Sequence, residues 1–140
     1  MDYEAVIPDL IRALYEGSSE LHDPILADDL RFSDPLVRVS GRAKVARMFR
    51  RLNGFFAASK VVTLICEEER EGYSRWRFDI DYARKEGAKP IRFHSHLEVT
   101  SSAGQIQSIT EHWHQPYELR GGTKGLIPRW MRAMAGWVVS

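Results

Sequence analysis

Cysteine is almost absent from this chain, with a single residue, Cys66, among 140. One cysteine cannot form a disulfide within the chain, which excludes a disulfide framework and fits a reducing compartment. The thiol lies in the apolar run at residues 61–66, so we expect it to be buried and inert. No stretch approaches the roughly 20 consecutive apolar residues of a transmembrane helix, so no membrane span is expected.

An excess of one charge is also lacking. Lysine and arginine number 20 and aspartate and glutamate 19, which gives a formal net charge of +1. A broad nucleic-acid-binding surface needs a strong basic excess, so we expect no nucleic-acid partner. The first residues include Asp2 and Glu4 without an apolar stretch after a basic start, which predicts no signal peptide. A chain of this length predicts a single domain, and we expect a cytoplasmic protein.

The first part of the chain has the pattern of helices joined by short extended pieces. The spacing of apolar residues predicts a helix over residues 7–15. Asp23-Pro24 begins a brief turn or helix, and short strands follow at residues 30–32 and 37–39. A second amphipathic helix begins at Arg42, with apolar residues at Val45, Met48, Phe49, Leu52, Phe55 and Phe56.

The polar face of the second predicted helix is basic. It carries Arg42, Lys44, Arg47, Arg50 and Arg51. This face is either a solvated surface or a surface that meets an acidic partner.

The rest of the chain, up to Pro116, is rich in predicted strands. Long segments at residues 61–69, 73–83, 91–99 and 105–113 show apolar runs or strict alternation. In the second segment one face carries Trp76, Phe78, Ile80 and Tyr82, and the other carries Arg75, Arg77, Asp79 and Asp81. In the third, Ile91, Phe93, Ser95, Leu97 and Val99 alternate with Arg92, His94, His96 and Glu98. Helices followed by long antiparallel hairpins predict an α+β domain with the helices packed on one face of a curved sheet.

The tail from Tyr117 differs in composition. Gly121-Gly122 precedes a predicted amphipathic helix within residues 126–139, which carries Trp130, Met131, Met134, Trp137 and Val138. This helix docks on the sheet or on a second subunit, covers a pocket as a lid, or meets a membrane surface.

Two blocks of sequence resemble the nuclear transport factor 2-like superfamily, which includes SnoaL-like cyclases and ketosteroid isomerases. The first is Ala27-Asp28-Asp29-Leu30-Arg31-Phe32-Ser33-Asp34-Pro35 followed by Gly41-Arg42, and the second runs from Gly104 to Trp113. The resemblance covers residues 5–116. It implies a cone-shaped, curved, mostly antiparallel sheet wrapped around N-terminal helices, also described as a cystatin-like roll, with an apolar pocket at its wide end. It also implies a homodimer and a single SnoaL-like domain over residues 1–140, with 117–140 as an extension or lid.

The resemblance also implies a chemistry. It is cofactor-free proton transfer, by an isomerase or lyase, on a flat apolar substrate such as a steroid or polyketide. In ketosteroid isomerases the general base is the aspartate of an Asp-Pro pair, and this aspartate corresponds to Asp34. Their oxyanion-hole tyrosine corresponds to Tyr15, and an alignment through Gly104 places His96 at the second donor. Glu111 is a further catalytic candidate.

The expected ligand-binding residues are Phe32, Trp76, Phe78, Ile80, Tyr82 and Trp113, of which those between 76 and 82 either line a pocket or fill the core. Glu111 points inward if Trp113 does, and a buried carboxylate needs a partner, for which His96 and Arg92 are the candidates. His94, His96, His112 and His114 could converge on a metal ion. We nevertheless expect none, because His112 and His114 point outward when Trp113 points inward. The alternative function is a non-catalytic ligand-binding or dimerisation module of the same fold.

Overall fold

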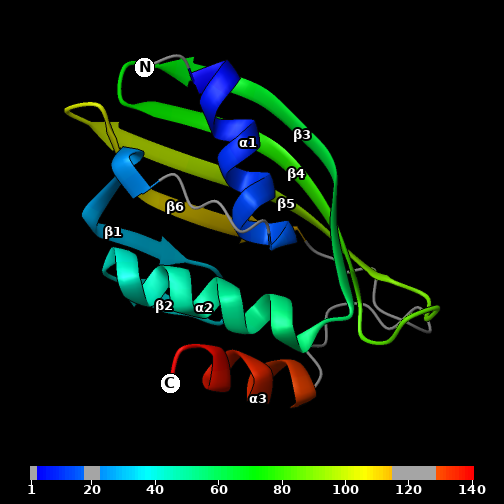
Figure 1. The fold of residues 1–140 in the computed structure, drawn as a ribbon. Coiled ribbons are helices and arrows are strands. Elements are labelled where there is room, and N and C mark those ends of the chain that lie inside the picture. The colour runs from blue at the N-terminus through cyan, green and yellow to red at the C-terminus, as the bar shows by residue number, and fades with distance from the viewer. Residues whose placement is uncertain (1–2, 18–22, 115–128) are drawn as a thin grey trace.

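A single curved sheet of six strands packs with its concave side against helices in the computed structural model, which describes residues 3–17, 23–114 and 129–140 (Figure 1). The strand order is β2-β1-β6-β5-β4-β3, and every neighbouring pair is antiparallel except β1 with β6. The elements are α1 (Tyr3–Glu16), the 3₁₀ turn η1 (Asp23–Ile25), β1 (Leu26–Ser33), β2 (Arg38–Ser40), α2 (Arg42–Phe55), β3 (Ala58–Arg70), β4 (Tyr73–Ala83), β5 (Ile91–Ser102), β6 (Gln105–Trp113) and α3 (Arg129–Val138). The α+β class and the curved, mostly antiparallel sheet are therefore confirmed.

The helices α1 and α2 bury their apolar faces inside the sheet. The buried side chains of α1 are Ile7, Leu10, Ile11, Ala13, Leu14 and Tyr15, and those of α2 are Val45, Met48 and Phe49. Helix α2 starts after Gly41, whose φ of 102° is a conformation that glycine adopts without a steric penalty. Helix α1 packs on β3, and α2 packs on β1. Both predicted helices are therefore confirmed: α1 extends beyond the predicted residues 7–15 at both ends, and α2 begins at the predicted Arg42.

Strands β4 and β5 follow the predicted alternation of inward and outward residues. Strands β4 and β6 have the predicted bounds, and β3 and β5 extend beyond them. On β4, the inward residues Trp76, Phe78, Ile80 and Tyr82 are buried. On the outer face, charged residues of neighbouring strands pair, with 2.7 Å between Arg92 Nε and Asp81 Oδ1.

Two expectations about the strands are wrong. Strand β1 begins at Leu26 rather than at residue 30, because it pairs with β6 from Leu26 onward across an irregularity that holds the exposed Asp28 and Asp29. Cys66 is only partly buried, because it lies on β3, which forms one edge of the sheet. A run of apolar residues does not indicate whether its strand lies at the edge of the sheet, where side chains are covered less completely.

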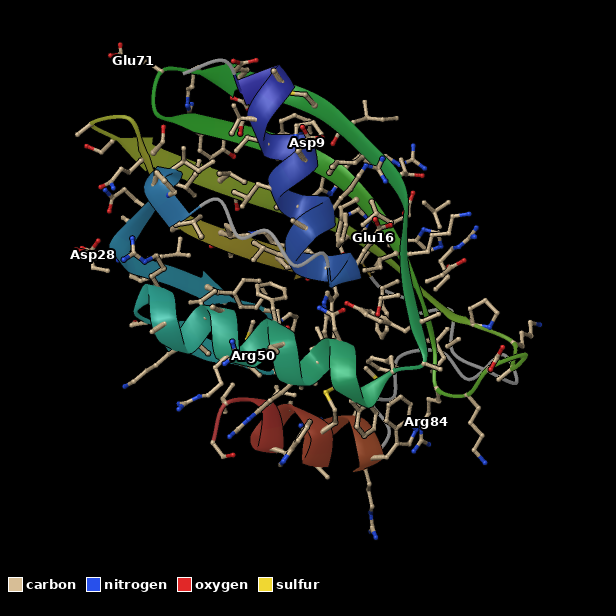
Figure 2. All side chains as sticks on the ribbon, in the orientation of Figure 1. Asp9, Glu16, Asp28, Arg50, Glu71 and Arg84 are labelled. Carbon is tan, nitrogen blue, oxygen red and sulfur yellow. The ribbon has the colours of Figure 1, made fainter. Side chains whose placement is uncertain are left out.

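Helix α3 lies against α2 (Figure 1). It buries Met131, Met134, Ala135 and Val138. The Arg84 guanidinium, whose residue is labelled in Figure 2, lies 4.4 Å from the ring centroid of Trp130 on this helix. The predicted Gly121-Gly122 and residues 126–128 lie outside the described residues. Within the described ranges, no helix has the length and apolar character needed to cross a bilayer.

Candidate functional site

A cavity of about 50 Å³ lies between the helices and the inner face of the sheet. A space of this volume holds roughly three or four water molecules. Its lining is Tyr15, Phe32, Asp34, Leu36, Val37, Met48, Leu52, Phe56, Tyr82, Phe93, Glu111, Trp113, Met131, Met134, Ala135 and Val138. The wall is therefore mostly apolar, with two carboxylates and two tyrosine hydroxyls as its polar groups.

Glu111 is buried on the inner face of β6, with 6% of its surface exposed. Its carboxylate accepts a hydrogen bond from the Tyr15 hydroxyl at 2.6 Å on Oε1. Its Oε2 accepts from Trp113 Nε1 at 2.7 Å and from Ser95 Oγ at 3.1 Å. Three donors from α1, β5 and β6 thus hold a single buried carboxylate in place, which is what a buried charge requires.

Asp34 follows the end of β1, where Pro35 turns the chain. Its Oδ1 accepts hydrogen bonds from the backbone N–H groups of Leu36 and Val37 at 2.7 and 2.8 Å. This side-chain turn fixes the orientation of the carboxylate. In the part of the chain that the structure describes, no hydrogen bond reaches its second oxygen, Oδ2. That oxygen is therefore the one that a ligand can engage.

Both carboxyl groups of the cavity have pKa values above the usual range. Burial raises the pKa of Glu111 to about 7, and the negative charge of Asp34 acts in the same direction, against the three hydrogen-bond donors. Burial also raises the pKa of Asp34, against the N–H groups of Leu36 and Val37. Two acids in a dry site disfavour double ionisation, so near neutral pH the pair can both hold and release a proton.

The two tyrosines of the cavity remain protonated. Burial, and then the charges of the nearby carboxylates, raise the pKa of Tyr15 and Tyr82 well above the usual tyrosine value. Tyr15 donates to Glu111, whereas the Tyr82 hydroxyl makes no hydrogen bond to any of the described residues. The Tyr82 ring stacks on Phe56, with 4.5 Å between the ring centroids. Tyr82 therefore brings a neutral donor to the cavity on a fixed aromatic ring.

The structure brings together six of the predicted site residues: Tyr15, Phe32, Asp34, Tyr82, Glu111 and Trp113. Trp76, Phe78 and Ile80 do not line the cavity but fill the core. The indole of Trp76 donates to Ser74 Oγ at 2.8 Å, away from the carboxylates. Of the two alternatives for these three side chains, lining a pocket or filling the core, the structure shows the second.

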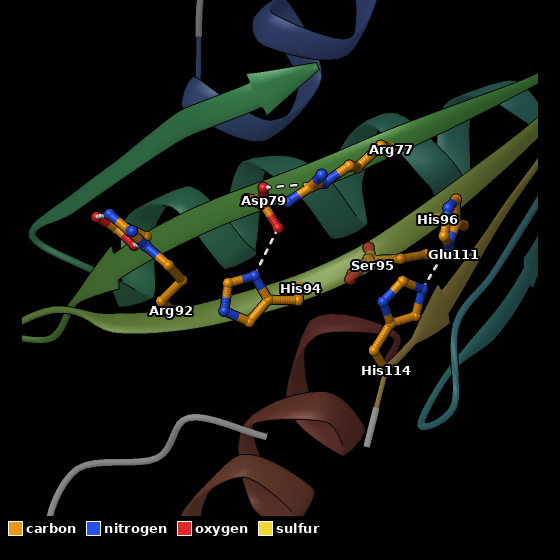
Figure 3. Close-up of polar contacts among 9 residues, drawn as sticks. Arg77, Asp79, Arg92, His94, Ser95, His96, Glu111 and His114 are labelled. Carbon is orange, nitrogen blue, oxygen red and sulfur yellow. Dashed lines mark hydrogen bonds and ion pairs between the residues drawn. The ribbon is translucent and has the colours of Figure 1, made fainter. Parts of the chain in front are cut away.

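The expectation that His96 joins Asp34 in the pocket is wrong. His96 lies on the outer face of the sheet, where it contacts His114 (Figure 3). It also contacts Glu67 there, at 2.5 Å. Along β5, residues 93, 95 and 97 point inward, so His96 cannot do so as well. Ser95 occupies the inward position beside Glu111. The alignment through Gly104 was out of phase with the alternation of the strand.

The prediction that His96 or Arg92 is the partner of Glu111 is also wrong. His96 lies on the other face of the sheet, and Arg92 pairs with Asp81 there. The Tyr15 hydroxyl, predicted to face a substrate, is instead bound to Glu111.

His94, His96 and His112 lie on the outer face of the sheet, and His114, directly after β6, lies beside His96. His94 contacts Asp79 at 2.7 Å, and His112 contacts Glu98 (Figure 3 shows the first of these). Across residues 3–17, 23–114 and 129–140, no group of three or more histidine, cysteine or acidic side chains is arranged to hold a metal ion.

Several lining residues were not predicted as ligand-binding. They are Leu36, Val37, Met48, Leu52, Phe56, Phe93, Met131, Met134, Ala135 and Val138. The apolar Leu36-Val37 pair directly after Asp34-Pro35 is a signal that could have identified two of them. The four residues of α3 carried a helical pattern, but that pattern did not indicate what they would cover.

Comparison with known proteins adds a family and a fold. The family model described as SnoaL-like domain matches residues 8–109. No curated protein matches the chain.

Three solved structures illustrate the likeness. One is a putative isomerase of the SnoaL-like family from Agrobacterium tumefaciens, at TM-score 0.65 and 15% identity, covering 81% of this chain and 99% of that one. Another is a hypothetical protein with a ketosteroid isomerase-like fold from Catenulispora acidiphila in complex with trimethylamine. Its TM-score is 0.66 and its sequence identity 11%, and the match covers 84% of this chain and 92% of that one. The third is a putative polyketide cyclase from Xanthomonas campestris. Its TM-score is 0.61 and its sequence identity 19%, and the match covers 76% of this chain and 89% of that one. At these identities the likeness shows the fold alone.

Proposed function

The chain belongs to the SnoaL-like domain family, and from this premise we propose that it is a small-molecule enzyme that transfers protons without a cofactor. The observation that carries the proposal is the pair of acidic side chains, Asp34 and Glu111, on the wall of an otherwise apolar cavity. A carboxylate in a dry site with a raised pKa is a stronger base than one in water. Structural neighbours include a putative isomerase and a putative polyketide cyclase, which supports the reaction class.

In the proposed reaction, Asp34 Oδ2 removes a proton from a carbon next to a substrate carbonyl. The electron pair of the broken C–H bond moves into a new C=C bond, and negative charge develops on the carbonyl oxygen. The Tyr82 hydroxyl donates a hydrogen bond to that oxygen. Returning the proton from Asp34 to a different carbon completes an isomerisation, and loss of a hydroxide leaving group, protonated by Glu111, completes a dehydration.

The size of the cavity limits the substrate that can enter without movement of α3. Pockets for drug-sized ligands are typically ~300–1,000 Å³, well above the 50 Å³ of this cavity. A steroid or polyketide therefore needs α3, which contributes four lining residues, to move aside. We propose that the 117–140 segment acts as a lid for such substrates. The small volume of the cavity also favours the second candidate, a ligand-binding module without catalysis.

Solvent proton exchange tests the proposal without knowledge of the product. A panel of small unsaturated ketones is incubated with protein in D₂O, and loss of the α-proton signal is followed by NMR. We expect Asp34→Asn to lower the exchange rate of a responsive ketone by about 10²–10⁴-fold, the usual contribution of a general base. Asp29→Asn, which changes an exposed carboxylate on β1, the strand that precedes Asp34, should leave the rate unchanged.

Equal exchange by the wild type and Asp34→Asn would contradict the proposed mechanism. Binding of ketones with no exchange by the wild type would favour the non-catalytic module.

A further inference from the structure

The cavity has charge of one sign only. Among the described residues, its lining holds two acidic side chains and no lysine, arginine or histidine. The donors that face Glu111, from Tyr15, Ser95 and Trp113, are all neutral. An anionic ligand would therefore meet two carboxylates without a counter-charge, and such a like-charge contact in a desolvated site is strongly unfavourable. A cation would supply the positive charge that the site lacks.

The apolar part of the lining also suits a cation. It includes the aromatic rings of Tyr15, Phe32, Phe56, Tyr82, Phe93 and Trp113. The electron-rich faces of such rings attract ammonium groups, and this attraction is larger in a desolvated pocket than at the surface. Methionine side chains at 48, 131 and 134 add polarisable contacts that adapt to an alkyl group.

We propose that this cavity binds a small organic monocation, a substituted amine or quaternary ammonium group, between the aromatic side chains and the carboxylates of Asp34 and Glu111. The cavity of about 50 Å³ has room for roughly three or four water-sized groups, so a fully alkylated ammonium group enters with a small outward movement of α3. The inference rests on the proposed function, since it names the ligand chemistry of the same cavity. It requires the carboxylates to be present but does not require them to be catalytic.

Binding of the cation is linked to protons. Four titratable side chains face the cavity: Asp34, Glu111, Tyr15 and Tyr82. Both tyrosines stay neutral through the neutral range, because burial raises their pKa values. A cation favours the ionised form of the carboxylates, so its binding lowers the pKa of Glu111 from about 7 and releases a proton. The affinity should therefore increase between pH 6 and pH 8.

Titration calorimetry with the full chain tests the proposal with three probes. Tetramethylammonium is the cation, tert-butyl alcohol is a neutral compound of similar shape, and acetate is a small anion, all at matched ionic strength. We expect tetramethylammonium to bind at pH 8 with a Kd at least about tenfold lower than that of tert-butyl alcohol, and acetate not to bind. Because this cation has no titratable proton, a weaker affinity at pH 6 reports the protein's own carboxylates.

Two variants remove the charges with little change of shape. Asp34→Asn and Glu111→Gln should each raise the Kd of tetramethylammonium about tenfold, while Asp29→Asn should leave it unchanged. The comparison of probes on the wild type stands even if a variant fails to fold.

Equal affinity for tert-butyl alcohol, or no saturable binding of the cation, would overturn the inference. The proton-exchange experiment separates this failure from that of the proposed function. Asp34-dependent exchange of a neutral ketone without cation binding leaves the enzyme proposal intact, whereas cation binding without any exchange supports only the binding site.

Discussion

The hydrogen bond from Tyr15 to Glu111 joins α1 to β6 through the interior. It is 2.6 Å long, and both residues are buried. The same pair of chemical groups occurs on the outer face, where Tyr73 donates to Glu98 at 2.7 Å in a partly exposed setting. A charge-assisted hydrogen bond is worth more where water cannot replace it. The two tyrosines therefore form a matched pair that separates burial from bond chemistry.

We predict that Tyr15→Phe lowers the free energy of unfolding by about 2 kcal/mol at pH 8, where Glu111 is ionised and loses one of its donors. Tyr73→Phe should cost less than about 1 kcal/mol, because solvent screens and replaces the exposed bond. The measurement is urea unfolding of both variants and the wild type. Equal losses for the two variants would show that Glu111 is not held by a buried hydrogen bond.

The sequence predicts which residues line the cavity better than it predicts which of their side chains contact one another. Asp34 is identified by the Asp-Pro pair, and Glu111 by its alternation with Trp113. Strand alternation assigns each residue to a face of the sheet, but it does not indicate which side chain lies opposite on the next element. For this reason Ser95 was missed as a partner of Glu111. His96 was placed on the wrong face, although alternation with Phe93 already predicted the outer one.

At the scale of elements, the strands were the most predictable part of the molecule. Strand β4 follows two-residue alternation over its apolar inner face, and β6 does so from Ile109 to Trp113, after a bulge that separates the buried Ile106 from Ile109. Helix α3 was predicted as amphipathic, but its position was not. An apolar helix face packs equally well on a sheet, on another helix or on a second subunit, so only the tertiary structure shows that it meets α2 and the cavity.

Arg51 ties the end of α3 to α2. Its Nη1 donates to the backbone oxygens of Trp137 at 3.0 Å and Ser140 at 2.6 Å. A cation at the C-terminal end of a helix binds the last carbonyl oxygens and interacts favourably with the helix dipole. Arg51 therefore acts as a clamp on α3 from the neighbouring helix.

We predict that Arg51→Ala weakens the docking of α3 by about 0.5–1 kcal/mol. Amide hydrogen exchange within residues 131–138 should then become up to about fivefold faster, with exchange in β4 unchanged. Arg50→Ala is the matched control, because Arg50 is an exposed neighbour on α2 (Figure 2). Equal exchange in the two variants would mean that apolar packing alone holds α3.

For the described part of the molecule as a whole, the carboxyl groups with shifted pKa values fall into two classes with opposite effects on stability. In the interior, burial raises the pKa values of Asp34 and Glu111. On the outer face, hydrogen bonds to Tyr73 and His112 lower the pKa of Glu98, against a smaller effect of burial. The curved sheet separates these classes, with a proton-accepting interior on one side and a network of charge pairs on the other.

The two classes act in different pH ranges. Between its ordinary value of 4.5 and about 7, Glu111 is protonated in the folded protein and ionised in the unfolded chain. Stability therefore falls as the pH rises through this window, by on the order of 3 kcal/mol in total. Glu98 has a lowered pKa, so its contribution is present above 4.5 and is lost as the pH falls through the folded value. Maximum stability is expected near pH 5, below neutrality.

Urea unfolding of the wild type and of Glu111→Gln at pH 5, 6, 7 and 8 checks this expectation. The wild type should lose on the order of 3 kcal/mol relative to the variant between pH 5 and pH 8, since glutamine fills the same space and carries no titratable proton. Glu98→Gln is the opposite control: its difference from the wild type should change only below about pH 5. Parallel pH profiles for the wild type and Glu111→Gln would show that Glu111 is ionised throughout. A permanently charged Glu111 could then not exchange a proton with Asp34 or a substrate near neutral pH.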